Sequence, residues 1–222
     1  MDHKRLTLFA GHYGSGKTNI AVNYAMQLAR EGRRVCIADL DIVNPYFRTK
    51  DSERELSEMG ISLVSPRFAN SNVDLPALPA ESYRLVQDKS TFGVMDIGGD
   101  DRGAYALGRF ADAIREEGDY RMAFVVNCYR PLTSTVEDAL EIMREIEAAA
   151  GLKFTCIVNN SNLGTETVPD TVLASLDFVR RLSEECGLEV WMHTAEKSLA
   201  DALCELPVLP MTLQKRIFDL PG

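Results

Sequence analysis

The 222-residue sequence lacks several features that would place it in whole classes of protein. No apolar run approaches the roughly 18 residues that a membrane-spanning helix needs. The N-terminus has basic residues but then only a short apolar stretch, so we expect no signal peptide and a cytoplasmic location. With 45% apolar and 26% charged residues, the composition predicts a soluble globular protein rather than a disordered or fibrous one.

Closely spaced cysteines are also absent. The 5 cysteines lie far apart, without a C-x-C or C-x-x-C pair, at Cys36, Cys128, Cys156, Cys186 and Cys204. This spacing does not predict a metal site, although it leaves open an iron–sulfur or zinc site between subunits. We interpret the cysteines as small buried hydrophobic residues in a reducing compartment.

Positive charge is scarce. The chain has 24 Lys and Arg against 33 Asp and Glu, a net charge of −9, and no basic stripe offsets it. An acidic surface repels nucleic-acid phosphates, so we do not expect a nucleic-acid partner. The C-terminal LQKRIFDLPG has only Lys215 and Arg216 as basic residues, which also disfavours binding to a membrane.

The sequence does contain a repeated alternation of helical and strand-like segments. Five times a helical pattern ends in glycine and a β-branched run follows, in LAREG-RRVCIADLD, LSEMG-ISLVSP, IREEG-DYRMAFVVN, EAAAG-LKFTCIVNN and SEECG-LEVWMHT. Glycine supplies the left-handed residue that closes a helix, and an apolar run between helices is typical of a strand buried on both faces. With LTLFAG and FGVMDIG, this makes about seven strands. We therefore predict an α/β fold with a doubly wound, mainly parallel sheet and helices on both faces, in a single domain spanning 1–222.

Two kinds of local signal complete this outline. Ser52 followed by Glu55, and Ser134 followed by Glu137, fit capping boxes at the start of helices. Residues 66–82 are rich in Pro and Asn, and they predict a long surface loop of the functional kind.

A phosphate-binding loop is predicted at Gly11-x-x-x-x-Gly16-Lys17-Thr18. The apolar run LTLFA precedes it and the helical pattern NIAVNYAMQLA follows, which is the context that this motif requires. Its glycines let backbone N–H groups converge on phosphate oxygens, and the helix beginning near Lys17 adds the positive end of its dipole. Lys17 should reach the β- and γ-phosphates, and the Thr18 hydroxyl should bind Mg²⁺.

Acidic residues end two of the strand-like runs. Asp39 and Asp41 lie on the same side of one strand, and Asp96 ends another, shortly before Gly99. Parallel strands deliver their carboxyl ends to the sheet edge where ligands bind. Close carboxylates repel unless a cation such as Mg²⁺ shares their charge, and a spare carboxylate can orient a water for in-line attack. A glycine such as Gly99 can offer its N–H to a γ-phosphate and move when that phosphate leaves.

A further strand end, Ile157-Val158-Asn159-Asn160, carries two amide side chains. An amide offers both a donor and an acceptor, which suits the edge of a purine base, and we assign this contact to Asn159. The alternative is that the Asn pair only forms a turn.

Together these motifs resemble those of the MinD/ParA/CobQ group of P-loop ATPases, and the chain is also similar to the nitrogenase iron protein and the nickel-insertion ATPases. GHYGSGKT resembles the family's deviant phosphate loop, IADLD its switch I and DIGGD its switch II. Tyr129-Arg130-Pro131 resembles the segment after the fifth strand, and IVNN the strand whose Asn contacts adenine.

The resemblance implies ATP and Mg²⁺ as cofactors and assigns roles to residues of this chain. Lys17 and Asp41 would act in hydrolysis, Asp41 by positioning the water, while Thr18 would bind Mg²⁺ directly and Asp39 and Asp96 through water. The nucleotide would contact Gly11, His12, Tyr13, Gly14, Ser15, Gly16, Lys17, Thr18, Asn19, Gly99 and Asn159. Family members usually form face-to-face dimers on ATP and act on a partner, so we expect a homodimer and a protein client.

The sequence departs from the family at His12 and Tyr13, where the signature lysine and the glycine after it would fall. A neutral imidazole lacks the full charge of a lysine, and removing a cationic finger can cost on the order of 10³ in rate. We therefore expect slow hydrolysis, or a cation from elsewhere, for which Arg48 is a candidate. An Arg48→Ala variant that hydrolyses ATP at the wild-type rate would exclude Arg48.

Three functions fit these motifs. The first is an ATPase that acts as a nucleotide switch on a protein client, in the assembly or maturation of another protein. The second is an ATP-dependent small-molecule ligase or kinase, although the sequence has no arginine-rich lid of the kind that kinases use. The third is an ATPase that positions DNA or membrane-bound cargo, which the acidic composition disfavours.

Overall fold

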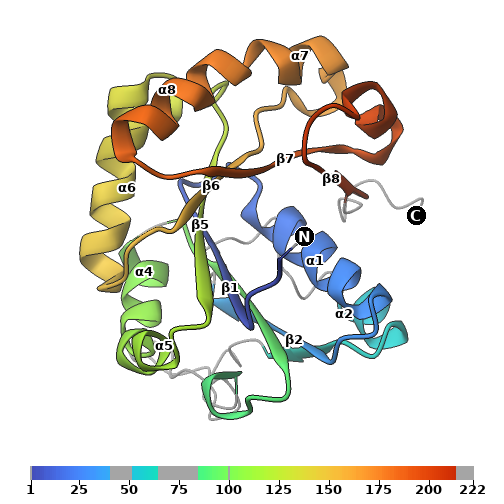
Figure 1. The fold of residues 1–222 in the computed structure, drawn as a ribbon, viewed down its shortest axis with the longest axis vertical. Coiled ribbons are helices and arrows are strands. Elements are labelled where there is room, and N and C mark those ends of the chain that lie inside the picture. The colour runs from blue at the N-terminus through green and yellow to red at the C-terminus, as the bar shows by residue number, and fades with distance from the viewer. Residues whose placement is uncertain (1, 41–51, 65–84, 100, 214–222) are drawn as a thin grey trace, which may run out of the picture.

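The computed structural model describes residues 2–40, 52–64, 85–99 and 101–213, and this part of the chain contains one eight-stranded sheet. The strands are β1 (Leu6–Ala10), β2 (Val35–Leu40), β3 (Ser62–Val64), β4 (Phe92–Ile97), β5 (Tyr120–Val126), β6 (Cys156–Asn159), β7 (Val190–Glu196) and β8 (Val208–Met211). Their spatial order is β3-β2-β4-β1-β5-β6-β7-β8, and every pairing is parallel (Figure 1). The prediction of a doubly wound parallel sheet is confirmed, with one strand more than expected.

The order in which successive strands are added to the sheet changes direction at β1. This strand pairs with β4 on one side and with β5 on the other, and the strands numbered 5 to 8 then follow in order away from it. In open parallel sheets, ligands bind beyond the carboxyl ends of the strands at such a reversal. The segment that leaves β1 therefore occupies the usual ligand position.

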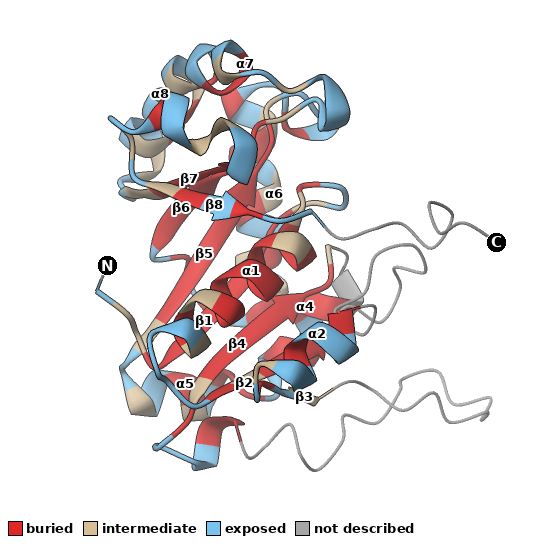
Figure 2. Ribbon diagram, turned by 90° about the vertical axis from the view of Figure 1, so that its right-hand side faces the viewer, coloured by how far each residue is buried: buried red, intermediate tan, exposed pale blue. Residues whose placement is uncertain are grey.

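Helices cover both faces of the sheet (Figures 1 and 2). One face carries α1 (Lys17–Arg30) and α2 (Glu53–Glu58), and the other carries α4 (Asp101–Gly108), α5 (Ala111–Glu117), α6 (Val136–Ala150) and α8 (Leu176–Cys186). Near the β7–β8 edge, α7 (Pro169–Ala174) packs with the 3₁₀ helix η4 (Lys197–Leu203). Because side chains of a strand alternate between faces, Phe9 and Val94 pack with α1, whereas Leu8 and Met95 join the opposite core.

The predicted helix ends are confirmed, but the capping boxes are not. The five glycines after helices, Gly32, Gly60, Gly118, Gly151 and Gly187, all have left-handed φ angles. Helix α6 begins one residue later than predicted, because the Thr135 hydroxyl accepts from the Asp138 N–H at 3.1 Å. Ser52 is the N-cap of α2, yet its side chain makes no capping hydrogen bond.

The strand that the sequence did not reveal is β8. It contains Pro210 and follows Pro207, and proline lacks the N–H that a central strand needs. The structure tolerates it because β8 is an edge strand that pairs only with β7. The predicted loop 66–82 lies wholly outside the described residues, and the single-domain organisation stays a prediction.

The cysteine interpretation is only partly correct. All 5 cysteines are free thiols, and Cys156 is buried, whereas Cys36, Cys128 and Cys186 are half-buried and Cys204 is exposed. The described residues contain no group of three or more His, Cys, Asp or Glu side chains that could hold a metal ion. Among the same residues, none of the helices has the length and apolarity needed to cross a lipid bilayer.

Candidate functional site

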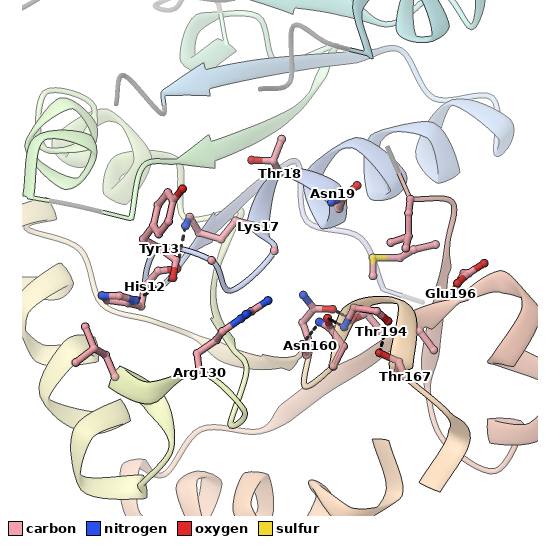
Figure 3. Close-up of a pocket in the computed structure, with 18 of the residues that line it drawn as sticks. His12, Tyr13, Lys17, Thr18, Asn19, Arg130, Asn160, Thr167, Thr194 and Glu196 are labelled. Atoms are coloured by element: carbon pink, nitrogen blue, oxygen red, sulfur yellow. Dashed lines mark hydrogen bonds between the residues drawn. The ribbon is translucent and has the colours of Figure 1, made fainter. Parts of the chain in front are cut away.

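The segment Gly11–Thr18 connects β1 to α1 and borders a cavity of about 720 Å³ (Figure 3). This phosphate-loop cavity has the size of a small-molecule site. Its lining comes from the loop, the first turn of α1, the segments that follow β5 and β6, and the carboxyl ends of β7 and β8: His12, Tyr13, Gly14, Gly16, Lys17, Thr18, Asn19, Arg130, Pro131, Leu132, Asn160, Asn162, Gly164, Thr167, Thr194, Ala195, Glu196, Met211 and Leu213. Of the nine loop residues predicted to bind nucleotide, seven line the cavity, whereas Gly11 and Ser15 are buried behind it.

Gly16 is the N-cap of α1, and both its backbone conformation and its close neighbours disfavour any residue with a side chain. Its φ angle of 90° lies in the left-handed region, which disfavours residues with a Cβ. A Cβ at Gly16 would also overlap the side-chain amide nitrogen of Asn160. The loop therefore presents its backbone to the cavity with no side chain at this position.

Lys17 is the first residue of α1, and its side chain is directed along the loop. Only 5% of Lys17 is exposed, and its Nζ donates to the carbonyl oxygen of His12 at 3.2 Å. Helix α1 carries no acidic residue in its first turn, so its amino end combines the helix dipole with one ammonium group. This end of the cavity is built to attract an anion.

Asp39 and Asp96 lie side by side at the carboxyl ends of β2 and β4. Their Cα atoms are register partners, and both residues are buried, at 3% and 0% exposure. Because side chains alternate along a strand, Asp39 points to the same face of the sheet as Ile37, and Asp96 to the same face as Val94. This is the face that α1, which begins with Lys17 and Thr18, covers. The predicted partner Asp41 lies outside the described residues, as does Arg48.

Gly99 reaches the phosphate loop through a close backbone approach. A Cβ at Gly99 would lie 2.6 Å from the backbone nitrogen of Tyr13, so only glycine fits against the loop here. Gly99 does not itself line the cavity. The structure therefore brings the segment after β4 into contact with the His12–Tyr13 part of the loop.

Asn159, to which we assigned the base contact from the sequence, is enclosed by the protein and does not line the cavity. Its amide nitrogen donates to Ser175 Oγ at 2.8 Å and to His193 Nδ1 at 3.0 Å. Its Oδ1 accepts from the Ser161 N–H at 3.1 Å. Burial lowers the pKa of His193 below its ordinary value, which keeps the imidazole neutral and able to accept from Asn159.

The neighbouring Asn160 lines the cavity instead. Its Nδ2 donates to the Ser15 carbonyl at 2.6 Å, and its Oδ1 accepts from the Thr194 hydroxyl. Side chains of successive residues in an extended segment point to opposite sides, so Asn159 is enclosed whereas the next residue, Asn160, faces the cavity. Asn160 ties the phosphate loop to the ends of β6 and β7.

Several cavity residues were not predicted from the sequence. Arg130 belongs to the Tyr129-Arg130-Pro131 segment, whose likeness to the family carried no assigned role, and Glu196 lies at the end of β7. Figure 3 shows Arg130 directed toward the phosphate loop and Glu196 near the opposite end of the cavity. Arg130 follows β5 and Glu196 is the last residue of β7, and this position at the ligand edge of the sheet is the signal that could have identified them.

Comparisons with known proteins identify solved structures of similar fold and one sequence family. No curated protein matches it significantly. Among solved structures, FtsY from Thermotoga maritima has a TM-score of 0.59 at 14% identity over 86% of this chain and 61% of its own. The 54 kDa signal recognition particle protein from Aeropyrum pernix K1, in complex with GDP, has a TM-score of 0.55 at 17% identity over 86% of this chain and 41% of its own.

Chloroplast FtsY from Physcomitrella patens gives similar values, with a TM-score of 0.59 at 15% identity over 87% of this chain and 59% of its own. This chain thus spans less than two thirds of these structures, and at such identities the likeness shows a shared fold. A family model described as the CobQ/CobB/MinD/ParA nucleotide binding domain matches residues 6–165, which include the phosphate loop, Asp39, Asp96 and Asn160. The chain therefore belongs to the CobQ/CobB/MinD/ParA nucleotide-binding family.

Proposed function

We propose that the protein is a slow, Mg²⁺-dependent ATPase that acts as a nucleotide switch on a protein client. The observation that carries this proposal is the phosphate-loop cavity, in which Gly16, Lys17 and Thr18 border a space of about 720 Å³. One end of the cavity offers backbone amides and an ammonium group for phosphates, and the other has the room and polar groups for a base and ribose.

The residues on the α1 face of β2 and β4 fit a magnesium ion. Mg²⁺ prefers oxygen ligands, keeps several waters and uses one or two carboxylates together with substrate phosphates. Two neighbouring buried carboxylates, Asp39 and Asp96, and the Thr18 hydroxyl supply such a donor set. When bound, the ion would neutralise phosphate charge, and the chain's part is to hold it through Thr18 and through waters on the two carboxylates.

The identity of the base has two candidates. The family resemblance favours adenine, and the chain has no N-K-x-D guanine motif. Glu196 favours guanine, because a carboxylate offers two acceptors and the guanine edge carries two adjacent donor groups. The Aeropyrum pernix relative in complex with GDP also favours the second candidate. We propose ATP as the physiological nucleotide, with GTP as the alternative that a binding comparison must exclude.

Slow turnover follows from the composition of the loop. At the position where the resemblance places a lysine, His12 Nδ1 contacts the carbonyl of its neighbour Tyr13, at 2.9 Å. Lys17 would stabilise the transferred charge, and Asp41 is proposed to position the water. The cavity rim also exposes Tyr13 and Leu132, at 53% and 58%, which suits a surface that a second copy or a client covers.

The test is to measure ATP hydrolysis and the oligomeric state of the protein in the same samples. With MgATP, the proposal expects low phosphate release that needs no added metabolite, and a shift of the full chain to a dimer in light scattering. Turnover that appears only with an added metabolite would favour the ligase or kinase alternative. Nucleotide-dependent pelleting with DNA or liposomes would favour a positioning ATPase, and both outcomes would overturn the client-switch proposal.

A further inference from the structure

Arg130 lies beside the phosphate loop although it is far from it in sequence. It follows β5 and precedes the 3₁₀ helix η2 (Pro131–Thr133), and its side chain lines the cavity. A Cβ at Gly14 would lie 3.9 Å from Arg130 Nε, which places the guanidinium next to the loop backbone. Figure 3 shows the side chain extending from its segment toward the loop.

The backbone around Arg130 is held in place by hydrogen bonds. The Arg130 N–H donates to the Asn127 carbonyl at 3.1 Å, and the Arg130 carbonyl accepts from the Thr133 N–H at 3.0 Å. Next to it, the Tyr129 N–H donates to Asn127 Oδ1 at 3.0 Å and the Tyr129 hydroxyl to the Thr171 carbonyl at 2.8 Å. Asn127 is fully buried, so the turn that carries Arg130 is anchored to the sheet.

The guanidinium of Arg130 faces the cavity and is not neutralised by a nearby carboxylate among the described residues. Arg130 is exposed, and within the described part of the chain it takes part in none of the ion pairs that join other arginines to Asp or Glu. The carboxylate that shares the cavity, Glu196, lies toward the other end (Figure 3). A guanidinium presents several N–H donors in a planar fork that matches the oxygens of a phosphate.

We propose that Arg130 binds phosphate oxygens of the nucleotide held by the phosphate loop of the same chain. It supplies a permanently charged guanidinium to the phosphates from within the chain. This inference rests on the proposed function, because it requires a nucleotide in the cavity. It differs from the Arg48 hypothesis, since Arg130 is placed at the loop by the fold itself.

The experiment compares Arg130→Ala, Arg130→Lys and wild type for binding of MgATP and MgGTP, and for displacement of the bound nucleotide by inorganic pyrophosphate. Arg181→Ala, which removes another exposed arginine on α8, is the charge-matched control. We expect Arg130→Ala to weaken triphosphate and pyrophosphate binding by roughly 10- to 100-fold, the factor for losing a charge-assisted hydrogen bond. Arg130→Lys should recover part of the loss, and Arg181→Ala should bind like wild type.

Two results would overturn the inference. One is an Arg130→Ala variant that binds both ligands as wild type does. The other is a loss of triphosphate affinity with unchanged pyrophosphate affinity, which would place Arg130 against base or ribose. Equal thermal midpoints of variant and wild type would verify that the variant is folded. We expect them to be equal, because the Arg130 side chain is exposed. If wild type itself binds no nucleotide with Mg²⁺, the proposed function fails, and that outcome is distinct from either result.

Discussion

The side-chain amide of Asn160 donates to the backbone carbonyl of Ser15 at 2.6 Å and joins two segments that are 145 residues apart in the chain. The same amide accepts from the Thr194 hydroxyl, so one residue links the phosphate loop, β6 and β7. Three of the loop's residues, Gly11, Gly14 and Gly16, have no side chain that could fix its shape. Asn160 supplies that constraint from across the sheet edge.

Replacing Asn160 by Ala should loosen the loop. The change leaves the buried Thr194 hydroxyl and the Ser15 carbonyl without this partner, which costs about 1–3 kcal/mol of unfolding free energy. Nucleotide affinity should fall by roughly tenfold in calorimetry, since part of the binding energy must then reorder the loop. Thr194→Ser keeps the hydroxyl and is the matched control. Wild-type affinity in Asn160→Ala would show that the loop holds its shape without the amide.

A Cβ at Gly99 should disturb the loop from the β4 side. It would lie 2.6 Å from Tyr13 N and 2.9 Å from Tyr13 Cα, which are backbone atoms that cannot rotate away. Gly99→Ala should therefore reduce nucleotide affinity with only a modest change in thermal midpoint. Gly108→Ala is the control, because a Cβ there meets its nearest atom at 3.4 Å. Equal affinities in the two variants would contradict the contact between Gly99 and the loop.

The loop could be predicted from sequence because its requirements are local. Gly16, Lys17 and Thr18 lie within one short segment, and the apolar runs beside it fix the strand and helix that hold it. The pairing of Asp39 with Asp96 followed in outline from the rule that parallel strands end at one edge. Asn160, Arg130 and Glu196 could not be assigned in this way, because their positions depend on contacts between distant segments.

Asn159 and β8 were harder to place from the sequence, for separate reasons. For Asn159, the sequence did not determine which of two adjacent residues faces the cavity, and a step of one residue reverses the direction of a strand side chain. The segment that forms β8 contains a proline, which a central strand disfavours, and only the tertiary structure shows that this strand lies at an edge. Both depend on packing that no local pattern records.

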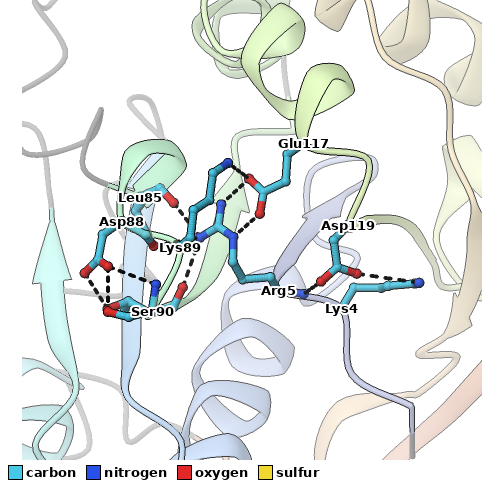
Figure 4. Close-up of polar contacts among 9 residues, drawn as sticks. Lys4, Arg5, Leu85, Asp88, Lys89, Ser90, Glu117 and Asp119 are labelled. Atoms are coloured by element: carbon cyan, nitrogen blue, oxygen red, sulfur yellow. Dashed lines mark hydrogen bonds and ion pairs between the residues drawn. The ribbon is translucent and has the colours of Figure 1, made fainter.

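Far from the cavity, Arg5 and Glu117 form a buried ion pair that should stabilise the amino-terminal end of the sheet (Figure 4). Their side chains are 8% and 5% exposed, and the Arg5 Nη1 also donates to the carbonyls of Leu85 and Thr91. Glu117→Gln would remove the negative charge that pairs with the buried Arg5 guanidinium, and it should lower the unfolding free energy by about 3 kcal/mol. Arg54→Ala, which breaks an exposed pair with Glu58, should leave the unfolding free energy unchanged.

The same pair predicts how stability depends on acid. Burial on its own would raise the pKa of Glu117, but the hydrogen bonds from Arg5 and Lys89 outweigh it and lower that pKa below its ordinary value. The unfolded chain then binds more protons, so this part of the stability is present above the ordinary Glu pKa and is lost as pH falls through the folded one. Urea titrations of wild type and Glu117→Gln between about pH 6 and 3 should converge in acid; parallel curves would contradict the pair.

His193 predicts a second loss of stability nearer neutrality. Its pKa is lowered by burial, so the folded state holds it neutral while the unfolded chain protonates it at about 6.5. The unfolding free energy should therefore fall as pH drops below about 6.5, until the folded pKa is reached. His193→Asn removes the titration and should flatten this part of the curve. An unchanged slope in the variant would assign the dependence to other groups.

The most direct test of the account is calorimetric titration of wild-type protein with ATP and with GTP in the presence of Mg²⁺, alongside Lys17→Ala. Wild type should bind one nucleotide per chain, and Lys17→Ala should lose that binding, because it lacks the ammonium that reaches the phosphates. Failure of folded wild type to bind either nucleotide, or equal affinity in Lys17→Ala, would contradict the account.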